Sequence, residues 1–317
     1  MIMLALILLL VVLLVGGPLD AQTNVWQPTA GHTQVPIWPG IGPDAQPAAG
    51  PEFTHPYKNK VAGRAVMLVE RVAQPTMTVY PPTGTNTGVA VVVFPGGGYN
   101  ALAIDLEGTE VCDWLASRGI TGVLSKYRVP GSGPYCDAPN HRPAAPMARA
   151  ALEDAQRTIG LVRAHAVEWH INPEKVGVLG SSAGGHLAAA VSTHFDRRLY
   201  PAVDGADQES CRPDFAVLLY PAYLLEDAAR DFELNPAIPV TGRTPPTFLL
   251  HAENDPAADV SNSLVYYAAL KKAEVAAELH IYSAGGHGFG LRRTKFPVSD
   301  WPGLVEKWLE SIGMVRK

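Results

Sequence analysis

A serine between two glycines is the residue of this chain best suited to nucleophilic chemistry. Gly180, Ser182 and Gly184 match the pattern G-x-S-x-G, between an apolar run that begins at Val176 and a small-residue run that ends at Ala190. That order predicts a buried strand, a sharp turn and a helix. Glycines on both sides of the serine let the backbone fold back and expose the hydroxyl. The alternative interpretation is a glycine-rich turn without chemistry.

A histidine further along the chain is placed to act as the base. A serine hydroxyl is a weak nucleophile and needs a base that a third group orients. His287 lies in a glycine-rich loop directly after a strand pattern that ends at Tyr282. The flanking glycines would let the loop carry the imidazole toward Ser182, so we predict His287 as the general base. Structural positions are expected for His165, His170, His186, His194 and His251.

Three carboxylates follow a strand pattern that ends at His251, and one of them is expected to orient the base. They are Glu253, Asp255 and Asp259. A carboxylate in this loop can accept a hydrogen bond from an imidazole Nδ1–H and fix the ring. Asp255 lies where the loop leaves the strand, whereas Asp259 could equally begin a helix, where the dipole favours an acidic residue. The residues alone leave all three open, and the choice of Asp255 depends on the resemblance described below.

Backbone N–H groups are needed to stabilise the negative charge that a serine attack creates. The N–H of Ala183, the residue after the nucleophile, is one candidate. A second apolar strand pattern is followed by Pro95-Gly96-Gly97-Gly98, whose glycines allow a close backbone approach. We therefore predict an oxyanion hole made by the N–H groups of Gly97, Gly98 and Ala183.

Alternating strand and helix patterns must position these residues. The predicted strands lie at 67–72, 76–80, 89–94, 122–127, 215–220, 247–251 and 277–282, and one more begins at Val176 and ends at the turn of Ser182. Helical patterns separate most of them, and the strands are apolar throughout. Such strands are typical of a mainly parallel sheet that helices cover on both faces. We therefore predict one α/β domain with about eight strands, because no internal repeat or linker interrupts the pattern.

Composition and the first residues restrict partners and location. The formal net charge is -5, with 47% hydrophobic residues, so no basic surface for nucleic acid is expected. Residues 1–21 resemble a signal peptide, because an apolar run is followed by small residues. This predicts a secreted or periplasmic protein with no stable membrane span after processing; a retained N-terminal anchor is the alternative. Residues 22–60 are rich in Pro, Gly and Ala and predict an extended arm, followed by a catalytic domain at 61–317.

The three cysteines give no metal-site spacing, so no metal is expected. Cys112 lies in a helical pattern and is expected to be a small buried side chain. Cys136 and Cys211 lie in polar, proline-containing loops, and export would permit a disulfide between them. The sequence leaves open whether this pair is bridged.

Over residues 65–315 the chain resembles α/β-hydrolase carboxylesterases near the hormone-sensitive-lipase and feruloyl/acetylxylan esterase groups. The glycines at 96–98 correspond to an HGGG motif in which Pro95 replaces the histidine. The resemblance is carried by Phe94–Tyr99, Glu107-Gly108, Lys126-Tyr127-Arg128, Asp154–Arg157, Gly180–His186, Asp255 and Gly285–Gly290.

The resemblance implies an α/β-hydrolase fold in which Ser182, Asp255 and His287 follow one another in chain order. It also implies ester hydrolysis through an acyl-enzyme, without a metal or organic cofactor. Because many exported members act on acylated plant polysaccharides, a short-acyl ester on carbohydrate such as acetylated xylan is the expected substrate. The alternatives are a generic carboxylesterase or feruloyl esterase, a peptidase or lactonase with the same triad, and a non-catalytic glycan binder. The pattern indicates no oligomeric state.

Overall fold

A computed structural model describes residues 25–131, 136–137, 142–143, 145–227 and 231–315 of the chain. The predicted signal peptide at 1–21 lies outside these residues. Within the described ranges, no helix has the length and apolar character that crossing a membrane requires.

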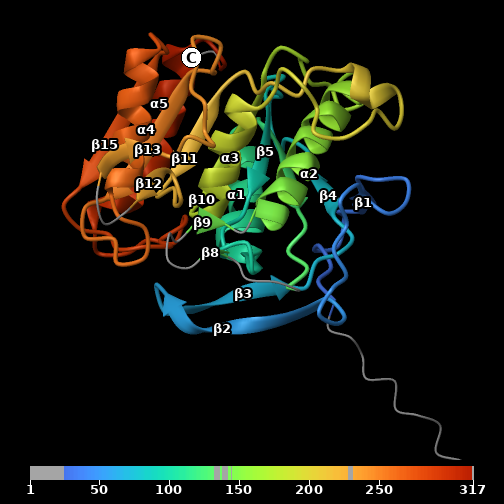
Figure 1. The fold of residues 1–317 in the computed structure, drawn as a ribbon, viewed down its shortest axis with the longest axis horizontal. Helices are drawn as coiled ribbons and strands as arrows, with labels where there is room; N and C mark the ends of the chain where they lie inside the picture. The colour runs from blue at the N-terminus through green and yellow to red at the C-terminus, as the bar shows by residue number, and fades with distance from the viewer. Residues whose placement is uncertain (1–24, 132–135, 138–141, 144, 228–230, 316–317) are drawn as a thin grey trace, which may run out of the picture.

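An eight-stranded sheet forms the centre of the molecule (Figure 1). Its strand order is β1-β4-β7-β5-β10-β11-β14-β15. The two pairs that involve β4 are antiparallel, and all other neighbours are parallel. The predicted α/β fold with a mostly parallel sheet is therefore confirmed. The strands are β1 (Gln34–Pro36), β4 (Thr76–Tyr80), β5 (Ala90–Phe94), β7 (Thr121–Lys126), β10 (Val176–Ser181), β11 (Ala216–Leu219), β14 (Thr247–Ala252) and β15 (Ala277–Tyr282).

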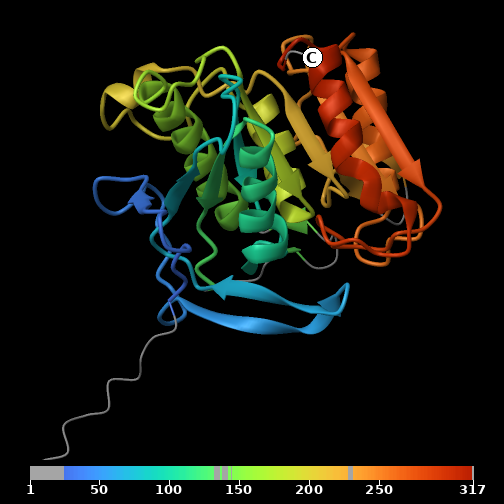
Figure 2. The same ribbon diagram turned by 180° about the vertical axis from the view of Figure 1, so that it is seen from behind.

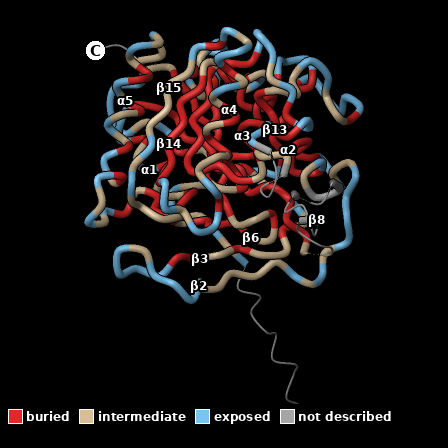
Figure 3. The backbone as a smooth tube through the Cα atoms, turned by 60° about the vertical axis from the view of Figure 1, so that its left-hand side comes forward, coloured by how far each residue is buried: buried red, intermediate tan, exposed pale blue. Residues whose placement is uncertain are grey.

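Helices on both faces explain why the central strands are apolar at every position. All residues of β5, β7, β10, β11 and β14 are buried, and the buried part of the backbone follows the sheet (Figure 3). Helices α2 (Ala145–Ala164) and α3 (Ala183–Thr193) cover the face seen in Figure 1. Helices α1 (Glu110–Ser117) and α5 (Trp301–Ser311) cover the other face (Figure 2). Helix α4 (Ser261–Lys272) packs along β14 and β15.

One predicted strand belongs elsewhere, and an arm segment replaces it in the large sheet. The segment predicted at 67–72 is part of β3 (Arg64–Glu70), which pairs with β2 (Phe53–Val61) and β6 (Ala101–Ala103). Arg71 has a φ of 60°, so the chain turns away from β3 before β4 begins. The β2–β3 hairpin crosses the end of the large sheet at which the parallel strands terminate (Figures 1 and 2).

The remaining elements are short. The strand pair β8 and β9 precedes α2, and the strand pair β12 and β13 follows β11. A π-helical turn, η1, leads directly into α1. These elements are β8 (Cys136–Asp137), β9 (Arg142–Pro143), β12 (Leu225–Asp227), β13 (Asp231–Leu234), η1 (Asp105–Thr109), η2 (Gly205–Gln208) and η3 (Pro297–Asp300).

The described part of the arm predicted at 22–60 packs against α2 as well as joining the sheet. The indole Nε1 of Trp38 donates to Asp154 Oδ1 at 2.8 Å. Arg157 Nε donates to the carbonyl of Ile37 at 2.8 Å. Both α2 side chains are buried. These hydrogen bonds attach the arm to the domain. Without the arm, the buried side chains of Asp154 and Arg157 would each lose a hydrogen-bond partner.

The disulfide considered for Cys136 and Cys211 is not present, because Cys211 is a free, buried cysteine. Its Sγ donates to the carbonyl of Phe195 at 3.5 Å. The loop of Cys211 lies beside the C-terminal end of α2, where Arg163 donates to the carbonyl of Ser210. Strand β8, which contains Cys136, precedes the N-terminal end of the same helix. A helix of 20 residues is about 30 Å long, so the two loops lie at opposite ends of it.

Candidate active site

Ser182 occupies a strained turn between β10 and α3, as the glycine pattern predicts. Its backbone has φ 53° and ψ -120°, a conformation that residues with a side chain rarely adopt. A Cβ added to Gly180 would lie 2.0 Å from the carbonyl oxygen of Gly184. A Cβ added to Gly184 would lie 2.0 Å from the carbonyl oxygen of Phe94. Both glycines are therefore required by backbone contacts at this turn.

The structure brings Ser182, His287 and Asp255 together. His287 Nε2 lies 2.9 Å from Ser182 Oγ, and His287 Nδ1 lies 2.6 Å from Asp255 Oδ2. Asp255 follows β14 and His287 follows β15, so two adjacent strands deliver the two side chains to the same end of the sheet. The Asp255 side chain is fully buried, whereas that of His287 is 21% exposed. The His287 ring is thus partly exposed, and its Nδ1 contacts a buried carboxylate.

Asp255 is held as a carboxylate by several donors. Its Oδ1 accepts the N–H of Ala258 at 2.9 Å, and Oδ2 lies 3.3 Å from Nε2 of the buried His251. Burial opposes ionisation, but the hydrogen bonds from His251, His287 and Ala258 outweigh it and hold the pKa of Asp255 below its ordinary value. An ionised Asp255 can only accept, so Nδ1 of His287 carries a proton and Nε2 is the acceptor for the serine hydroxyl.

The two rival carboxylates lie outside this arrangement. Asp259 Oδ1 accepts the N–H of Ser261 at 2.8 Å where α4 begins, which is the helix-start role that its sequence position allowed. Glu253 is exposed. Of the three candidates, Asp255 is thus the one in contact with His287.

The loop after β5 lies against the turn that carries Ser182. A Cβ added to Gly96 would lie 2.8 Å from Cβ of Ser182. Gly97 and Gly98 have φ values of +132° and +67°, which favour glycine. A Cβ on Gly97 would also lie 2.1 Å from the carbonyl oxygen of Ala101. Close approach and backbone conformation together explain the triglycine sequence.

The carbonyl groups of this loop point toward β6, so its N–H groups point away from β6. The Gly96 carbonyl accepts the N–H of Ala103 at 2.9 Å, and the Gly97 carbonyl accepts the N–H of Ala101 at 3.1 Å. In a trans peptide unit the C=O and N–H point in opposite directions. The N–H groups of Gly97 and Gly98 belong to these two units, and within the described chain neither has an acceptor. Both are therefore available to an anion.

Ala183 supplies a third N–H group of this kind. It is the first residue of α3, so its N–H has no partner within the helix. The positive end of the helix dipole adds to the attraction for an anion beside Ser182. The three predicted oxyanion donors are thus N–H groups without internal acceptors in the part of the chain that the structure describes.

Four neighbours of the site were not predicted as site residues. Asn254 Oδ1 accepts the N–H groups of both Gly285 and Gly286 at 3.0 Å and so fixes the loop before His287. The ring of Tyr220 packs edge-on against the His287 ring with centroids 5.0 Å apart. The other two are Glu107, which accepts the N–H of Gly96, and His251, whose Nε2 lies 3.3 Å from Asp255 Oδ2. The sequence signals that could have indicated these residues were a position next to a strand end or inside one of the motifs that carry the resemblance.

His186 has the structural role that its helix position predicts. It is buried on α3, and its Nδ1 lies 2.7 Å from the hydroxyl of Tyr99. Burial lowers the pKa of His186 to about 4, so the ring is neutral at neutral pH. A neutral ring carries one N–H group, so the tautomer of His186 decides which of the two groups donates.

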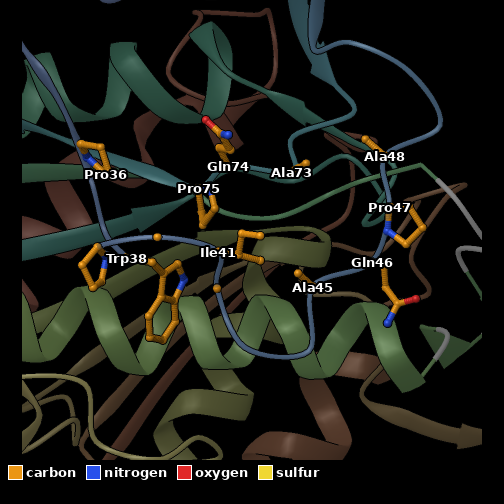
Figure 4. A pocket seen from close by; sticks show the side chains of 13 residues that line it. Pro36, Trp38, Ile41, Ala45, Gln46, Pro47, Ala48, Ala73, Gln74 and Pro75 are labelled. Atoms are coloured by element: carbon orange, nitrogen blue, oxygen red, sulfur yellow. The ribbon is translucent and has the colours of Figure 1, made fainter.

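The described residues form no metal cluster, and a pocket among them lies away from this site. Among the described residues, no group of His, Cys, Asp and Glu is arranged to hold a metal ion. A pocket of about 750 Å³ lies between the N-terminal arm and the segment before β4, with Trp38, Ile41 and Pro75 in its lining (Figure 4). Its lining contains none of the residues predicted to act in catalysis.

Parallel strands that deliver a serine, an aspartate and a histidine at their carboxyl ends are the arrangement found in α/β hydrolases. Comparison with protein-family models gives the same class, because the Abhydrolase_3 model, described as alpha/beta hydrolase fold, matches residues 91–291. The chain belongs to this α/β-hydrolase family.

Several similar proteins are known by name. The acetylxylan esterase of Xylanibacter ruminicola is 30% identical over 250 residues, which cover 71% of this chain and 46% of that protein. Endo-1,4-beta-xylanase B of Butyrivibrio fibrisolvens is 27% identical over 67% of this chain and 34% of that protein. The chain thus matches less than half the length of these two relatives. The crystal structure of an acetyl ester-xyloside bifunctional hydrolase from Caldicellulosiruptor lactoaceticus is 34% identical, with a TM-score of 0.67, and the match covers 90% of this chain and 97% of that one.

Proposed function

We propose that this chain is a serine carboxylesterase that hydrolyses short-acyl esters, and that its substrate is acylated carbohydrate such as acetylated xylan. The observation that carries the proposal is the continuous pair of hydrogen bonds from Asp255 through His287 to Ser182. A serine in this relation to a histidine and a buried carboxylate is an activated nucleophile.

In the proposed reaction, Ser182 Oγ attacks the ester carbonyl while His287 Nε2 takes its proton. Asp255 holds Nδ1–H and stabilises the imidazolium that forms. The imidazolium then gives its proton to the departing alcohol oxygen as the tetrahedral intermediate collapses to an acyl-enzyme. Water, activated by the same His287, attacks the acyl-enzyme and releases the carboxylic acid.

The developing oxyanion is assigned to the N–H groups of Gly97, Gly98 and Ala183. Fixed donors that point at the place where charge develops need no reorganisation during the reaction, which is why they lower the barrier. Each donor is expected to contribute about 2.7–4 kcal/mol to transition-state stabilisation. The availability of these three N–H groups supports the assignment.

The carbohydrate part of the proposal is supported by the names of similar proteins. One is called an acetylxylan esterase, another an endo-1,4-beta-xylanase, and a third an acetyl ester-xyloside hydrolase. These names share a xylan or xyloside, and two of them share an acetyl ester. An acetyl group on a xylose unit is therefore the first substrate to test.

Export is part of the same proposal. Residues 1–21 are proposed as a signal peptide, 22–60 as an N-terminal arm and 61–317 as the catalytic domain. Intact xylan lies outside the cell that degrades it, so an enzyme that acts on the polymer must be exported. Sequencing the N-terminus of the protein recovered from an expressing culture tests the cleavage; a first residue of Gln22 is expected, and an intact Met1 would contradict it.

The function is tested by comparing wild type with Ser182→Ala on a panel of esters. p-Nitrophenyl acetate, acetylated xylan, methyl ferulate and p-nitrophenyl esters of rising chain length are the substrates. We expect acetate release from xylan, a preference for short acyl chains, and a loss of kcat of several orders of magnitude in Ser182→Ala. Near wild-type rates in the variant would overturn the mechanism. Activity on aryl esters alone would overturn the carbohydrate assignment.

A further inference from the structure

Glu107 is a buried carboxylate beside the proposed site that the mechanism above does not use. The residue is only 3% exposed and lies in the π-helical turn η1. Within the described residues it forms no ion pair with a lysine or arginine. Burying a carboxylate without a cation is costly unless hydrogen bonds compensate. Single π turns occur often at functional sites, so the local backbone also marks this position.

Both carboxylate oxygens of Glu107 accept hydrogen bonds from segments of the site. Oε2 accepts the N–H of Gly96 at 2.7 Å. Oε1 accepts the hydroxyl of Tyr220 at 2.9 Å. The first donor belongs to the loop that carries the oxyanion donors, and the second follows β11. Glu107 therefore joins two segments that are 124 residues apart between Gly96 and Tyr220.

The peptide unit between Pro95 and Gly96 is fixed at both ends. Its N–H donates to Glu107, and its carbonyl accepts the hydroxyl of Tyr127 at 2.6 Å. The next peptide units carry the N–H groups of Gly97 and Gly98. The orientation of the first unit sets the direction of the following ones, so Glu107 and Tyr127 together determine where the oxyanion donors point.

Tyr220 continues the connection to the histidine. Its ring contacts that of His287 with centroids 5.0 Å apart, and its hydroxyl oxygen accepts the N–H of Gly290 at 3.3 Å. A Cβ on Gly288 would lie 4.0 Å from Glu107 Oε1, so the loop after the histidine passes directly beside the carboxylate. One carboxylate is thus in contact, directly or through Tyr220, with both halves of the proposed machinery.

We propose that Glu107 is a positioning residue that holds the oxyanion loop, through the Gly96 N–H, in register with the loop of His287. The proposal rests on the proposed esterase function, because it concerns the donors of that reaction. Glu107 acts through the backbone and through Tyr220 and touches no reacting atom.

Glu107→Ala removes the acceptor and is the first test. Misdirected oxyanion donors stabilise the transition state less, so kcat for p-nitrophenyl acetate should fall about 10²- to 10³-fold. KM should change by less than about threefold, since the ground state makes little use of these donors. A folded variant with kcat within about threefold of wild type would overturn the proposal. If circular dichroism shows that Glu107→Ala is unfolded, Glu107→Asp gives the same test, because its shorter side chain cannot keep the contact with Gly96.

Glu107→Gln separates the hydrogen bond from the charge. The amide oxygen can still accept the Gly96 N–H, and the Tyr220 hydroxyl can rotate to accept the amide NH₂. We expect kcat within about tenfold of wild type, with the acid limb in the pH profile of kcat/KM at or slightly below its wild-type pH, because loss of the charge beside His287 favours the neutral ring. The titratable groups that face Glu107 are His287, Tyr220, Tyr127 and Asp105. An acid limb displaced to lower pH, with kcat as low as in Glu107→Ala, would show that charge on the histidine matters instead and would overturn the positioning role.

Tyr127→Phe and Asp214→Asn complete the design. Because Tyr127 holds the same peptide unit, the kcat losses of Tyr127→Phe and Glu107→Ala should combine to less than their product; a fully multiplicative result would overturn the proposal. Asp214 is the matched control, since its carboxylate accepts the Val176 N–H at 2.8 Å at the opposite end of β10 from Ser182. Asp214→Asn should lower stability and leave kcat unchanged. A wild-type protein without esterase activity would refute the proposed function itself, a result distinct from an active Glu107→Ala.

Discussion

At the scale of the residue, the site depends on how each group holds the next. Asp255 is ionised because buried donors surround it, and its negative charge decides which nitrogen of His287 carries the proton. The serine and histidine could be predicted from glycine patterns. His251 could not, because its contact with Asp255 depends on side-chain packing behind β14 that a strand-end position does not reveal.

Asp255→Asn should preserve the shape of the site and remove its charge. The amide can donate to His287 and so favour the tautomer with the proton on Nε2, which cannot accept from Ser182. We expect a fall in kcat of about 10³- to 10⁴-fold with little change in KM. Steady-state kinetics measures it, and Asp259→Asn is the control because Asp259 binds only the start of α4. Equal effects of the two substitutions would contradict the assignment.

His186 predicts a pH dependence of stability. Its pKa is about 4 in the folded protein, against an ordinary value of 6.5. Between these pH values the unfolded chain binds a proton that the folded protein does not. The contribution of a neutral His186 to the free energy of unfolding is therefore complete above about pH 6.5 and is lost as the pH falls toward 4. Replacing His186 with Gln should reduce the loss of unfolding free energy between pH 7 and pH 5 by about 2 kcal/mol. Urea unfolding at both pH values measures it; the same pH dependence in both proteins would contradict the prediction.

At the scale of the element, strand ends and the turns after them create the site. The alternation of apolar strands and helices made the parallel strands predictable, and the residues after β5, β10, β14 and β15 converge because these strands end at the same side. The π turn η1 was not predictable, since its i+5 hydrogen bond, from Thr109 N–H to the Ile104 carbonyl at 2.8 Å, has no sequence signature. Glu107 lies in one of the motifs that carry the resemblance, but its contact with Gly96 depends on this turn and was not predicted.

The close contact of α3 with β5 gives an element-scale prediction. Gly184→Ala would place its Cβ 2.0 Å from the carbonyl oxygen of Phe94, and backbone on both sides must shift. Overpacking of this kind costs typically about 1–3 kcal/mol and should also displace the Ser182 turn, with at least about a tenfold loss of kcat. Gly303→Ala on α5 is the control, because nothing lies within 4 Å of its added Cβ. It should stabilise the protein slightly, as alanine favours helix. Thermal unfolding and kcat that are unchanged in Gly184→Ala would contradict this packing.

At the scale of the whole molecule, the N-terminal arm and the β2–β3 hairpin were the parts least predictable from the sequence. The pattern at 67–72 was rightly interpreted as a strand, but the strand was wrongly placed in the large sheet. Local periodicity does not determine which distant segment a strand pairs with. β1 was missed because a strand of three residues, Gln34–Pro36, is too short to show alternation.

The arm is expected to stabilise the whole fold. Trp38 is 4% exposed, and its Nε1 donates to the fully buried Asp154. Trp38→Ala should lower the unfolding free energy by about 3–5 kcal/mol, since it opens a cavity and removes a donor from Asp154. Ile41, 92% exposed on the same arm, provides the control, and Ile41→Ala should change stability by less than about 0.5 kcal/mol. Chemical denaturation measures both; equal midpoints for Trp38→Ala and wild type would mean that the arm does not support the domain.

The central claim is that Ser182 forms a covalent acyl-enzyme with the ester. Intact-protein mass spectrometry after rapid quenching of the reaction with p-nitrophenyl acetate, followed by peptide mapping, tests it most directly. One acetyl group per chain, located on Ser182, matched by one equivalent of p-nitrophenol in the burst and absent from Ser182→Ala, is the predicted result. Full turnover with the acetyl group on another residue, or an undiminished burst in Ser182→Ala, would contradict the account.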